Sequence, residues 1–125
     1  MRHGRRFNHL SRKCGHRRAL LRNLAISLIK NKRIVTTLAK GRALKKFIEP
    51  VLTESKDNSM NSRRLVFSKL VNKDAVKELF NNVSGYIMNR NGGYTRIIKL
   101  SSRFGDNAKM CSIDLIDFSD DKRNR

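Results

Sequence analysis

The sequence predicts an α+β domain in the order helix, strand, three helices and two strands, with helices packed against a small sheet. Apolar residues recur at helical spacing in four stretches of the chain before Ser84. One β-branched run separates the first two stretches, and two strand-like runs follow the last. The length of 125 residues is close to the commonest size of one domain.

The chain begins with a basic arm over residues 1–15 that shows no apolar periodicity. Only Phe7 and Leu10 interrupt its polar run, so we expect the arm to be extended, and disordered unless it is bound. We expect a single globular domain over residues 16–118 and a flexible charged tail over residues 119–125.

Residues 16–31 predict the first helix, because their apolar residues form one stripe at helical spacing: Leu20, Leu21, Leu24, Leu28 and Ile29. Arg18 and Arg22 are four residues apart and project together from another face. Residues 33–37 predict a short strand, since the last four of them are β-branched.

A second helix is expected from about Leu38, with five apolar residues in helical register: Leu44, Phe47, Ile48, Val51 and Leu52. Pro50 lies inside this pattern and removes one backbone donor, so it must kink or split the helix. We favour a kink, because the apolar stripe continues beyond the proline.

The third helix is expected over residues 60–70, with Asn58 or Ser59 as its N-terminal cap. Its expected inward residues are Leu65, Val66 and Leu70, and its outward residues are Arg63, Arg64 and Lys69. Asn72 can cap a fourth helix, which has the clearest amphipathic pattern of the chain: Val76, Leu79, Phe80 and Val83.

Two strands complete the predicted domain. A Gly-Gly turn within residues 89–100 leads into the first strand, and residues 101–108 form a polar loop. Residues 109–117 then alternate, with Cys111, Ile113 and Leu115 on one face and Ser112 and Asp114 on the other. We expect the two strands to pair as a hairpin across the loop.

The charge of the chain favours a polyanionic partner. It has 29 basic and 10 acidic residues, a net charge of +19 and a pI of about 11.2. No acid precedes Glu49, so residues 1–48 contain fifteen Lys or Arg and no carboxylate. We therefore expect the contact surface in the first part of the chain and a more ordinary domain body in the second.

Several other classes fit the sequence poorly. Cys14 and Cys111 are far apart and no secretory signal is present, so we expect reduced thiols and no disulfide framework. No apolar run approaches the ~18 residues of a membrane span. A cleaved transit peptide is disfavoured, because the basic start continues directly into a helix without a small-residue cleavage region.

A zinc site in the arm is also disfavoured. Its four potential ligands are His3, His9, Cys14 and His16, which lack the two close pairs typical of structural zinc sites. The many basic residues around them would repel a dication. We therefore expect no metal and no cofactor, and the histidines are better explained as nucleic-acid contacts.

Enzymatic activity has little support in the sequence. No nucleophile elbow or phosphate-cradling loop is present, and no acid–base group is evident. The late acids Asp114, Asp117, Asp120 and Asp121 could hold magnesium in a nuclease. A solvated strand edge and tail that balance part of the positive charge explain them better, so we expect no small-molecule substrate.

Three segments together predict nucleic-acid binding. The arm and first helix can neutralise phosphates. The strand–helix junction places cations and hydroxyls near free helix N–H groups, which attract anions. The glycine-rich turn lets backbone amides approach a phosphate, with arginines on either side and a tyrosine that can stack on a base. The candidates are Arg2, Arg5, Arg6, Arg12, Lys13, Arg17, Arg18 and Arg22; Lys32, Arg33, Thr36, Thr37 and Lys40; Arg63 and Arg64; and Arg90, Gly92, Gly93, Tyr94, Thr95 and Arg96.

RNA is favoured over DNA as the partner. No helix-turn-helix, zinc-finger or basic-zipper pattern is present. An extended basic arm beside a small domain suits the irregular grooves of a large folded RNA. A nucleoid-type DNA-binding protein is the alternative that the charge alone allows.

A set of short motifs also occurs in a characteristic order. These are MRH at 1–3, HRRALLRNL at 16–24, IVTTLAKGRALK at 34–45, EPVL at 49–52, NSRRLVFSKL at 61–70, KELF at 77–80, NGGYTRIIKL at 91–100 and RFGDNAKM at 103–110. Through them nearly the whole chain resembles the family of bacterial large-subunit ribosomal protein seventeen.

This resemblance implies a cytoplasmic ribosomal protein that binds and stabilises 23S rRNA near the exit of the nascent-chain tunnel. It implies large-subunit proteins twenty-two and thirty-two as neighbours, a small mixed three-stranded sheet, no catalytic role and no membrane contact. By the same resemblance His3, His16 and Asn23 join the RNA-facing residues of the arm and first helix, and Arg103 contacts RNA from the hairpin loop. Gly41 stands where the family usually has Ala, which should weaken that turn by ~1 kcal/mol.

Overall fold

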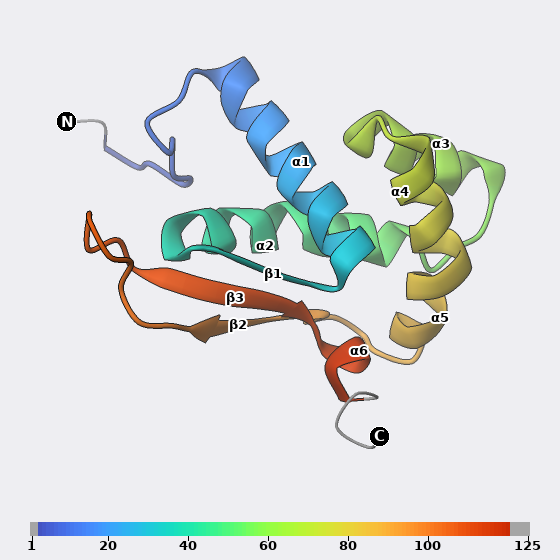
Figure 1. Cartoon of the computed structure of the whole chain (residues 1–125). Helices are drawn as coiled ribbons and strands as arrows, with labels where there is room; N and C mark the ends of the chain where they lie inside the picture. The colour runs from blue at the N-terminus through green and yellow to red at the C-terminus, as the bar shows by residue number, and fades with distance from the viewer. Residues whose placement is uncertain (1–2, 121–125) are drawn as a thin grey trace.

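The structure is a computed structural model that describes residues 3–120, so Arg2 and the predicted tail beyond residue 120 lie outside the described residues. Helices cover one face of the sheet (Figure 1). The elements are α1 (Cys14–Asn31), β1 (Arg33–Thr37), α2 (Leu38–Glu54), α3 (Met60–Leu70), α4 (Lys73–Glu78), the π-helical turn η1 (Leu79–Val83), α5 (Ser84–Ile87), β2 (Thr95–Lys99), β3 (Met110–Leu115) and α6 (Ile116–Asp120). This order confirms the predicted α+β class.

The sheet of the described chain has the strand order β1-β3-β2. β3 pairs antiparallel with both neighbours, through Ile34↔Ile113 on one side and Ile97↔Ile113 on the other. The predicted hairpin of the last two strands is therefore confirmed, but the expected mixed sheet is wrong. β1 and β2 run in the same direction, yet β3 lies between them, so no parallel pair forms.

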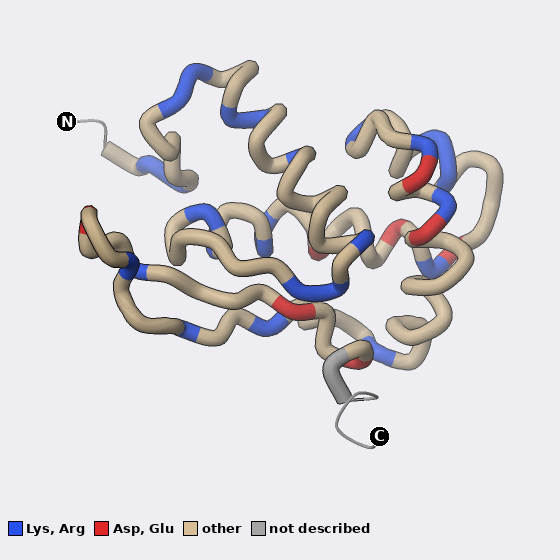
Figure 2. Tube along the Cα trace, in the orientation of Figure 1, with Lys and Arg blue, Asp and Glu red and all other residues tan. Residues whose placement is uncertain are grey.

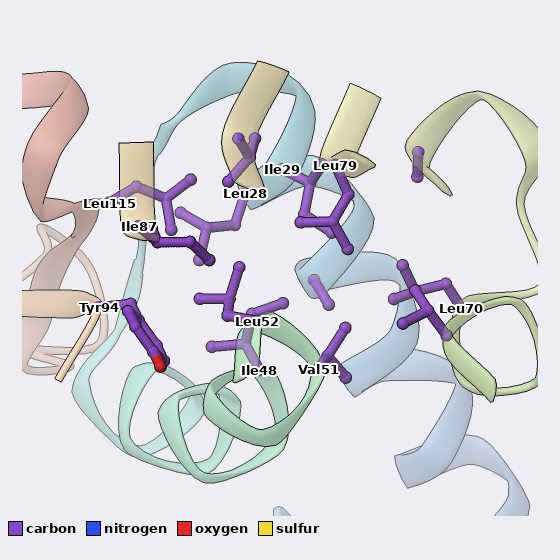
Figure 3. Close-up of a cluster of buried hydrophobic side chains, with 14 of the residues drawn as sticks. Leu28, Ile29, Ile48, Val51, Leu52, Leu70, Leu79, Ile87, Tyr94 and Leu115 are labelled. Carbon is purple, nitrogen blue, oxygen red and sulfur yellow. The ribbon is translucent and has the colours of Figure 1, made fainter. Parts of the chain in front are cut away.

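The core lies between α2 and the elements around it. Figure 3 shows three residues of α2, Ile48, Val51 and Leu52. They face Leu28 of α1, Ile87 of α5 and Leu115 of β3. All of these side chains are at most 1% exposed. Burying an aliphatic side chain of this size stabilises a fold by roughly 1.5–3 kcal/mol, so this contact region holds the helical layer on the sheet.

The predicted third and fourth helices form largely as expected. The side chains of Ser59 and Asn72 cap α3 and α4 by accepting from backbone N–H groups three residues on. The four predicted core residues from Val76 to Val83 are buried. Leu65 is 43% exposed, so its prediction as an inward residue is wrong; α3 presents only the neighbouring stripe of Ser62, Val66 and Leu70 to the core.

Helix α2 continues through Pro50 to Glu54, so the proline does not split it.

None of the described helices is long and apolar enough to cross a membrane.

Gly41 lies where α2 packs closely against β3. A Cβ atom at this position would lie 2.6 Å from the Sγ atom of Cys111, which is buried on β3. Real Cβ atoms do not approach another atom so closely, so an alanine at this position would force the thiol or the backbone to move. The absence of a side chain at residue 41 therefore makes room for the thiol at residue 111.

We predict that Gly41→Ala lowers the free energy of unfolding by about 1–2 kcal/mol, because overpacking against Cys111 outweighs the gain in helix propensity. Urea unfolding followed by circular dichroism measures this change. Gly85→Ala is the matched control, since a Cβ there meets nothing within 4 Å, and it should be neutral or stabilising. The double variant Gly41→Ala/Cys111→Ala should regain stability relative to Gly41→Ala, and a failure to do so would contradict the steric explanation.

Candidate nucleic-acid interface

Acidic side chains engage some of the predicted RNA-binding cations within the protein. Five ion pairs occur in the described structure: Lys32–Glu78, Arg33–Asp114, Arg90–Asp117, Arg96–Asp114 and Arg103–Asp106. All five cations were predicted to bind RNA. Within residues 3–120, by contrast, no ion pair includes a Lys or Arg of the arm, α1 or α2. The uncompensated charge is therefore concentrated in the first part of the chain.

Asp114 joins the three strands on the outer face of the sheet. Its carboxylate accepts hydrogen bonds from Arg33 of β1 at 2.8 and 2.7 Å and from Ser112 at 2.8 Å, and Arg96 of β2 lies at 3.9 Å. Burial by itself would raise the pKa of Asp114, but these hydrogen bonds and the arginine charges outweigh it and hold the pKa below its usual value. The side chain is 1% exposed, so the interpretation of this acid as a solvated strand edge is wrong.

The glycine-rich turn before β2 is held by Glu49 of α2. The Glu49 carboxylate accepts from the backbone N–H groups of Tyr94 and Thr95, each at 3.1 Å, and from the Thr95 hydroxyl at 2.6 Å. The backbone amides that follow Gly93 thus bind a carboxylate of the protein, where the sequence predicted a phosphate. Glu49 was missed, although it is the first acid after a long acid-free stretch.

Tyr94 is a core residue. Its ring is 1% exposed, the ammonium group of Lys56 lies 4.9 Å from its centroid, and its hydroxyl accepts from Thr53 at 3.3 Å. Such burial is incompatible with stacking on a nucleobase. The structure therefore does not support the predicted stacking role of Tyr94. The hydroxyl of Thr95 already donates to Glu49, and the side chain of Thr36 is buried as well.

Arg90 pairs with Asp117 of α6 at 2.9 Å, and its carbonyl accepts from Lys56. Gly92 and Gly93 are exposed, and Gly93 has the positive φ of +63° that favours glycine. The two arginines of the predicted clamp thus form ion pairs within the protein: Arg90 with Asp117 of α6, and Arg96 of β2 with Asp114 of β3.

A cleft of about 1110 Å³ lies between the arm, α1, the first half of α2 and the connection between β2 and β3. Its lining includes five cations and no carboxylate: Arg17, Arg42, Lys46, Lys99 and Lys109. Apolar side chains line the rest, among them Leu21, Leu38 and Phe47. Figure 2 shows Lys and Arg on each of the surrounding elements (Figure 2). We call this feature the basic cleft.

The arm folds back over one side of the basic cleft. It turns at Leu10 and Ser11, both with φ of 53°. The guanidinium of Arg17 lies 5.0 Å from the centroid of the Phe7 ring, a cation–π distance. Lys46 of α2 donates to the carbonyl of Arg6 at 3.5 Å. The described part of the arm is thus in contact with α1 and α2.

The other predicted residues lie around and beyond the cleft. Arg17 and Thr37 line the cleft, and Lys40 is half-buried on α2. Exposed residues of the arm and α1 are His3, Arg5, Arg6, Lys13, His16, Arg18 and Asn23; Arg12 and Arg22 are half-buried. Arg63 stacks over Phe80 at 4.9 Å, and neither it nor Arg64 on α3 lines the cleft.

Four of the five cleft cations were missed by the sequence analysis. Arg42 and Lys46 are four residues apart and share a helix face, which was a usable signal. Lys99 and Lys109 are brought together only by the pairing of β2 with β3. Among the described residues, no three His, Cys, Asp or Glu side chains are placed to hold a metal ion, including those of the arm.

The chain is similar to a family of known proteins. A sequence profile described as "Ribosomal protein L17" matches residues 20–116. The "Large ribosomal subunit protein bL17" of Phocaeicola vulgatus and that of Bacteroides thetaiotaomicron are each 58% identical over 120 residues, which cover 96% of this chain and 74% of each relative. The protein of the same name from Amoebophilus asiaticus is 56% identical over 119 residues, covering 95% of this chain and 61% of the relative.

We predict that Asp114→Asn lowers the free energy of unfolding at pH 7 by about 2 kcal/mol, because it removes one partner of a buried charge pair whose arginines are partly solvated. The folded pKa is depressed, so this stabilisation is present above the unfolded value of about 3.9 and is lost as the pH falls through the folded pKa. Urea unfolding at pH 7 and in acid measures it.

The difference between wild type and Asp114→Asn should therefore shrink on acidification below about pH 4. Asp106→Asn, which removes an exposed Arg–Asp pair, is the control and should have a smaller effect at pH 7. Equal stabilities of wild type and Asp114→Asn at pH 7 would contradict the role of the buried carboxylate.

Proposed function

The chain belongs to the ribosomal protein L17 family, and from this premise we propose that it binds ribosomal RNA through the basic cleft and the arm. It is a structural protein of the large subunit of the cytoplasmic ribosome and not an enzyme. It holds RNA segments in place and neutralises the phosphate charge that would keep those segments apart.

This proposal is carried by one observation: cations paired with carboxylates and cations without such partners lie in different parts of the molecule. The ion-paired arginines stabilise the sheet and the loops, whereas the five cations of the basic cleft have no carboxylate among its lining residues. Five cations around one cleft repel one another, and a phosphate backbone relieves that repulsion while releasing condensed counterions. The apolar part of the lining adds a surface against which sugars and bases can pack.

The shape of the site favours RNA over duplex DNA. The cleft is bounded by an irregular arm, a helix end and a loop, and no described element presents an isolated helix for the major groove of DNA. Folded RNA offers bulges, loops and irregular grooves that can enter such a cleft.

In finer detail, the proposed ligand is 23S rRNA near the exit of the nascent-chain tunnel, with large-subunit proteins twenty-two and thirty-two as neighbours. The motif resemblance of nearly the whole chain supports this location. Crosslinking of assembled subunits from residues of the basic cleft, followed by identification of the attached RNA and proteins, tests it. Crosslinks confined to other RNA regions and proteins would overturn it.

We predict that replacing Arg42, Lys46 and Lys109 together by Gln weakens RNA binding about tenfold or more at moderate salt and flattens its salt dependence. The slope of log affinity against log salt should fall in magnitude by about 2, because each lost phosphate contact removes roughly 0.7–0.9. Filter binding or fluorescence anisotropy over a salt series measures both effects.

Lys73→Gln/Lys77→Gln removes two charges and is the control for Lys46→Gln/Lys109→Gln, which removes two charges from the cleft. Lys73 and Lys77 are exposed on α4, at the other end of the molecule from the cleft (Figure 1), so the control should change affinity and slope much less. An equal loss in the two variants would mean that binding follows net charge and does not depend on the cleft.

We predict that deletion of residues 1–12 leaves the domain folded but reduces its incorporation into large subunits. No arm residue belongs to the hydrophobic core, and α1 begins only at Cys14. Circular dichroism checks the fold, and competition between full-length and shortened chains in cells, followed by sedimentation of subunits in high salt, measures incorporation. A melted spectrum, or equal incorporation of both chains, would contradict this expectation.

A further inference from the structure

The loop between β2 and β3 presents a fully exposed aromatic ring. Phe104 at its tip has a relative exposure of 103%, the highest of any large hydrophobic residue in the described part of the chain. The next most exposed, Met60, reaches 67%. A phenyl group held entirely in water makes no packing contact within the fold, so the ring is free to contact a ligand bound beside the loop.

The loop holds this ring on an ordered base. Arg103 donates to both carboxylate oxygens of Asp106, at 3.1 and 2.5 Å, and the N–H of Ala108 donates to the same carboxylate at 3.2 Å. The N–H of Arg103 donates to the carbonyl of Ala108 at 2.8 Å, which closes the loop, and Gly105 makes the turn with φ of +100°. None of these contacts uses the phenyl ring, so the loop is built without it and presents it to solvent.

The same loop forms one wall of the basic cleft. Its two stems contribute Lys99, Leu100 and Ser102 on one side and Ala108, Lys109 and Met110 on the other. The tip lies at the end of the molecule where the arm and the start of α2 are found (Figure 1). A nucleic-acid strand with its phosphates in the cleft would therefore pass beside the tip.

We propose that Phe104 stacks on an unpaired nucleobase of the RNA whose backbone occupies the basic cleft. This inference rests on the proposed function and adds the kind of RNA that the site takes: a loop, bulge or single-stranded segment with a free base face. Bases inside a duplex already stack on their neighbours, whereas an unpaired base can stack on an aromatic side chain. A phenyl ring has no hydrogen-bonding group, so the contact tolerates any base.

Charge selects RNA as the occupant over an apolar pocket of another protein. The two cleft cations nearest in sequence to the loop tip are Lys99 and Lys109, and Arg42 and Lys46 face the same cleft from α2. A protein surface that covered Phe104 would have to place its own atoms against these cations. An unpaired nucleotide brings both the apolar base face and the phosphate in one ligand.

The chain has no tryptophan, so Phe104→Trp places a single tryptophan at the tip, whose emission can be excited selectively. We expect its emission to be quenched when the full chain binds a single-stranded oligoadenylate, and to change much less with a blunt RNA duplex of equal length. Met60→Trp is the control, because Met60 is exposed on α3 and does not line the cleft; its emission should stay constant.

Affinity provides the second measurement. Phe104→Ala should weaken binding of the oligoadenylate about tenfold, within the range known for loss of one base–aromatic stack, while Phe104→Tyr retains it. Binding of inorganic polyphosphate, which has no bases, should be unchanged by Phe104→Ala. Lys46→Gln/Lys109→Gln should weaken binding of both probes.

These variants test the stacking contact and the basic cleft separately. If the lysine variant loses affinity but Phe104→Ala does not and the reporter is not quenched, the stacking proposal is wrong and the basic cleft stands. If the lysine variant also binds RNA like wild type, the proposed interface itself is wrong. Reporter emission that shifts to the blue without quenching in assembled large subunits would place Phe104 in a protein pocket and overturn the stacking proposal.

Discussion

The Asp114 carboxylate lies on the central strand, with an arginine of each neighbouring strand beside it. Backbone hydrogen bonds alone would leave two cations facing each other across β3, and the buried acid removes that repulsion. This constraint extends beyond the sheet. A chain with ten acids and 29 basic residues can compensate only some of its charge. In the described structure, four of the carboxylates form ion pairs that connect strands, loops and helices.

The position of the basic cleft follows from the same distribution. Acid-free segments meet there: the arm, α1 and the first half of α2, closed on the far side by the stems of the β2–β3 loop. The apolar core below fixes α2 on the sheet, so the cations on its exposed side are held at a fixed spacing. The phosphates of the proposed RNA partner then neutralise the cations of the basic cleft. The protein's own carboxylates neutralise the cations that hold the fold together.

Local patterns in the sequence were sufficient for most elements of the fold. The spacing of Val76, Leu79, Phe80 and Val83 specified a buried helical face, and Ser59 and Asn72 acted as caps where their chemistry predicted. Contacts between distant residues were not accessible in this way. Glu49 binds the turn before β2 from 45 and 46 residues away, and the register Arg33↔Asp114↔Arg96 exists only once the strands are paired. Isolated basic residues therefore looked alike in the sequence, although pairing makes some of them structural and leaves others exposed around a cleft.

The contact between Gly41 and Cys111 links a helix position to a strand position through shared volume. The combined volume of the two side chains is limited, because α2 can keep its distance from β3 only if both fit in the space between them. A relative with Ala at the first position is expected to have a smaller residue at the second. Exchanges at these two sites should therefore occur together in evolution, and each would look unfavourable if it were judged alone.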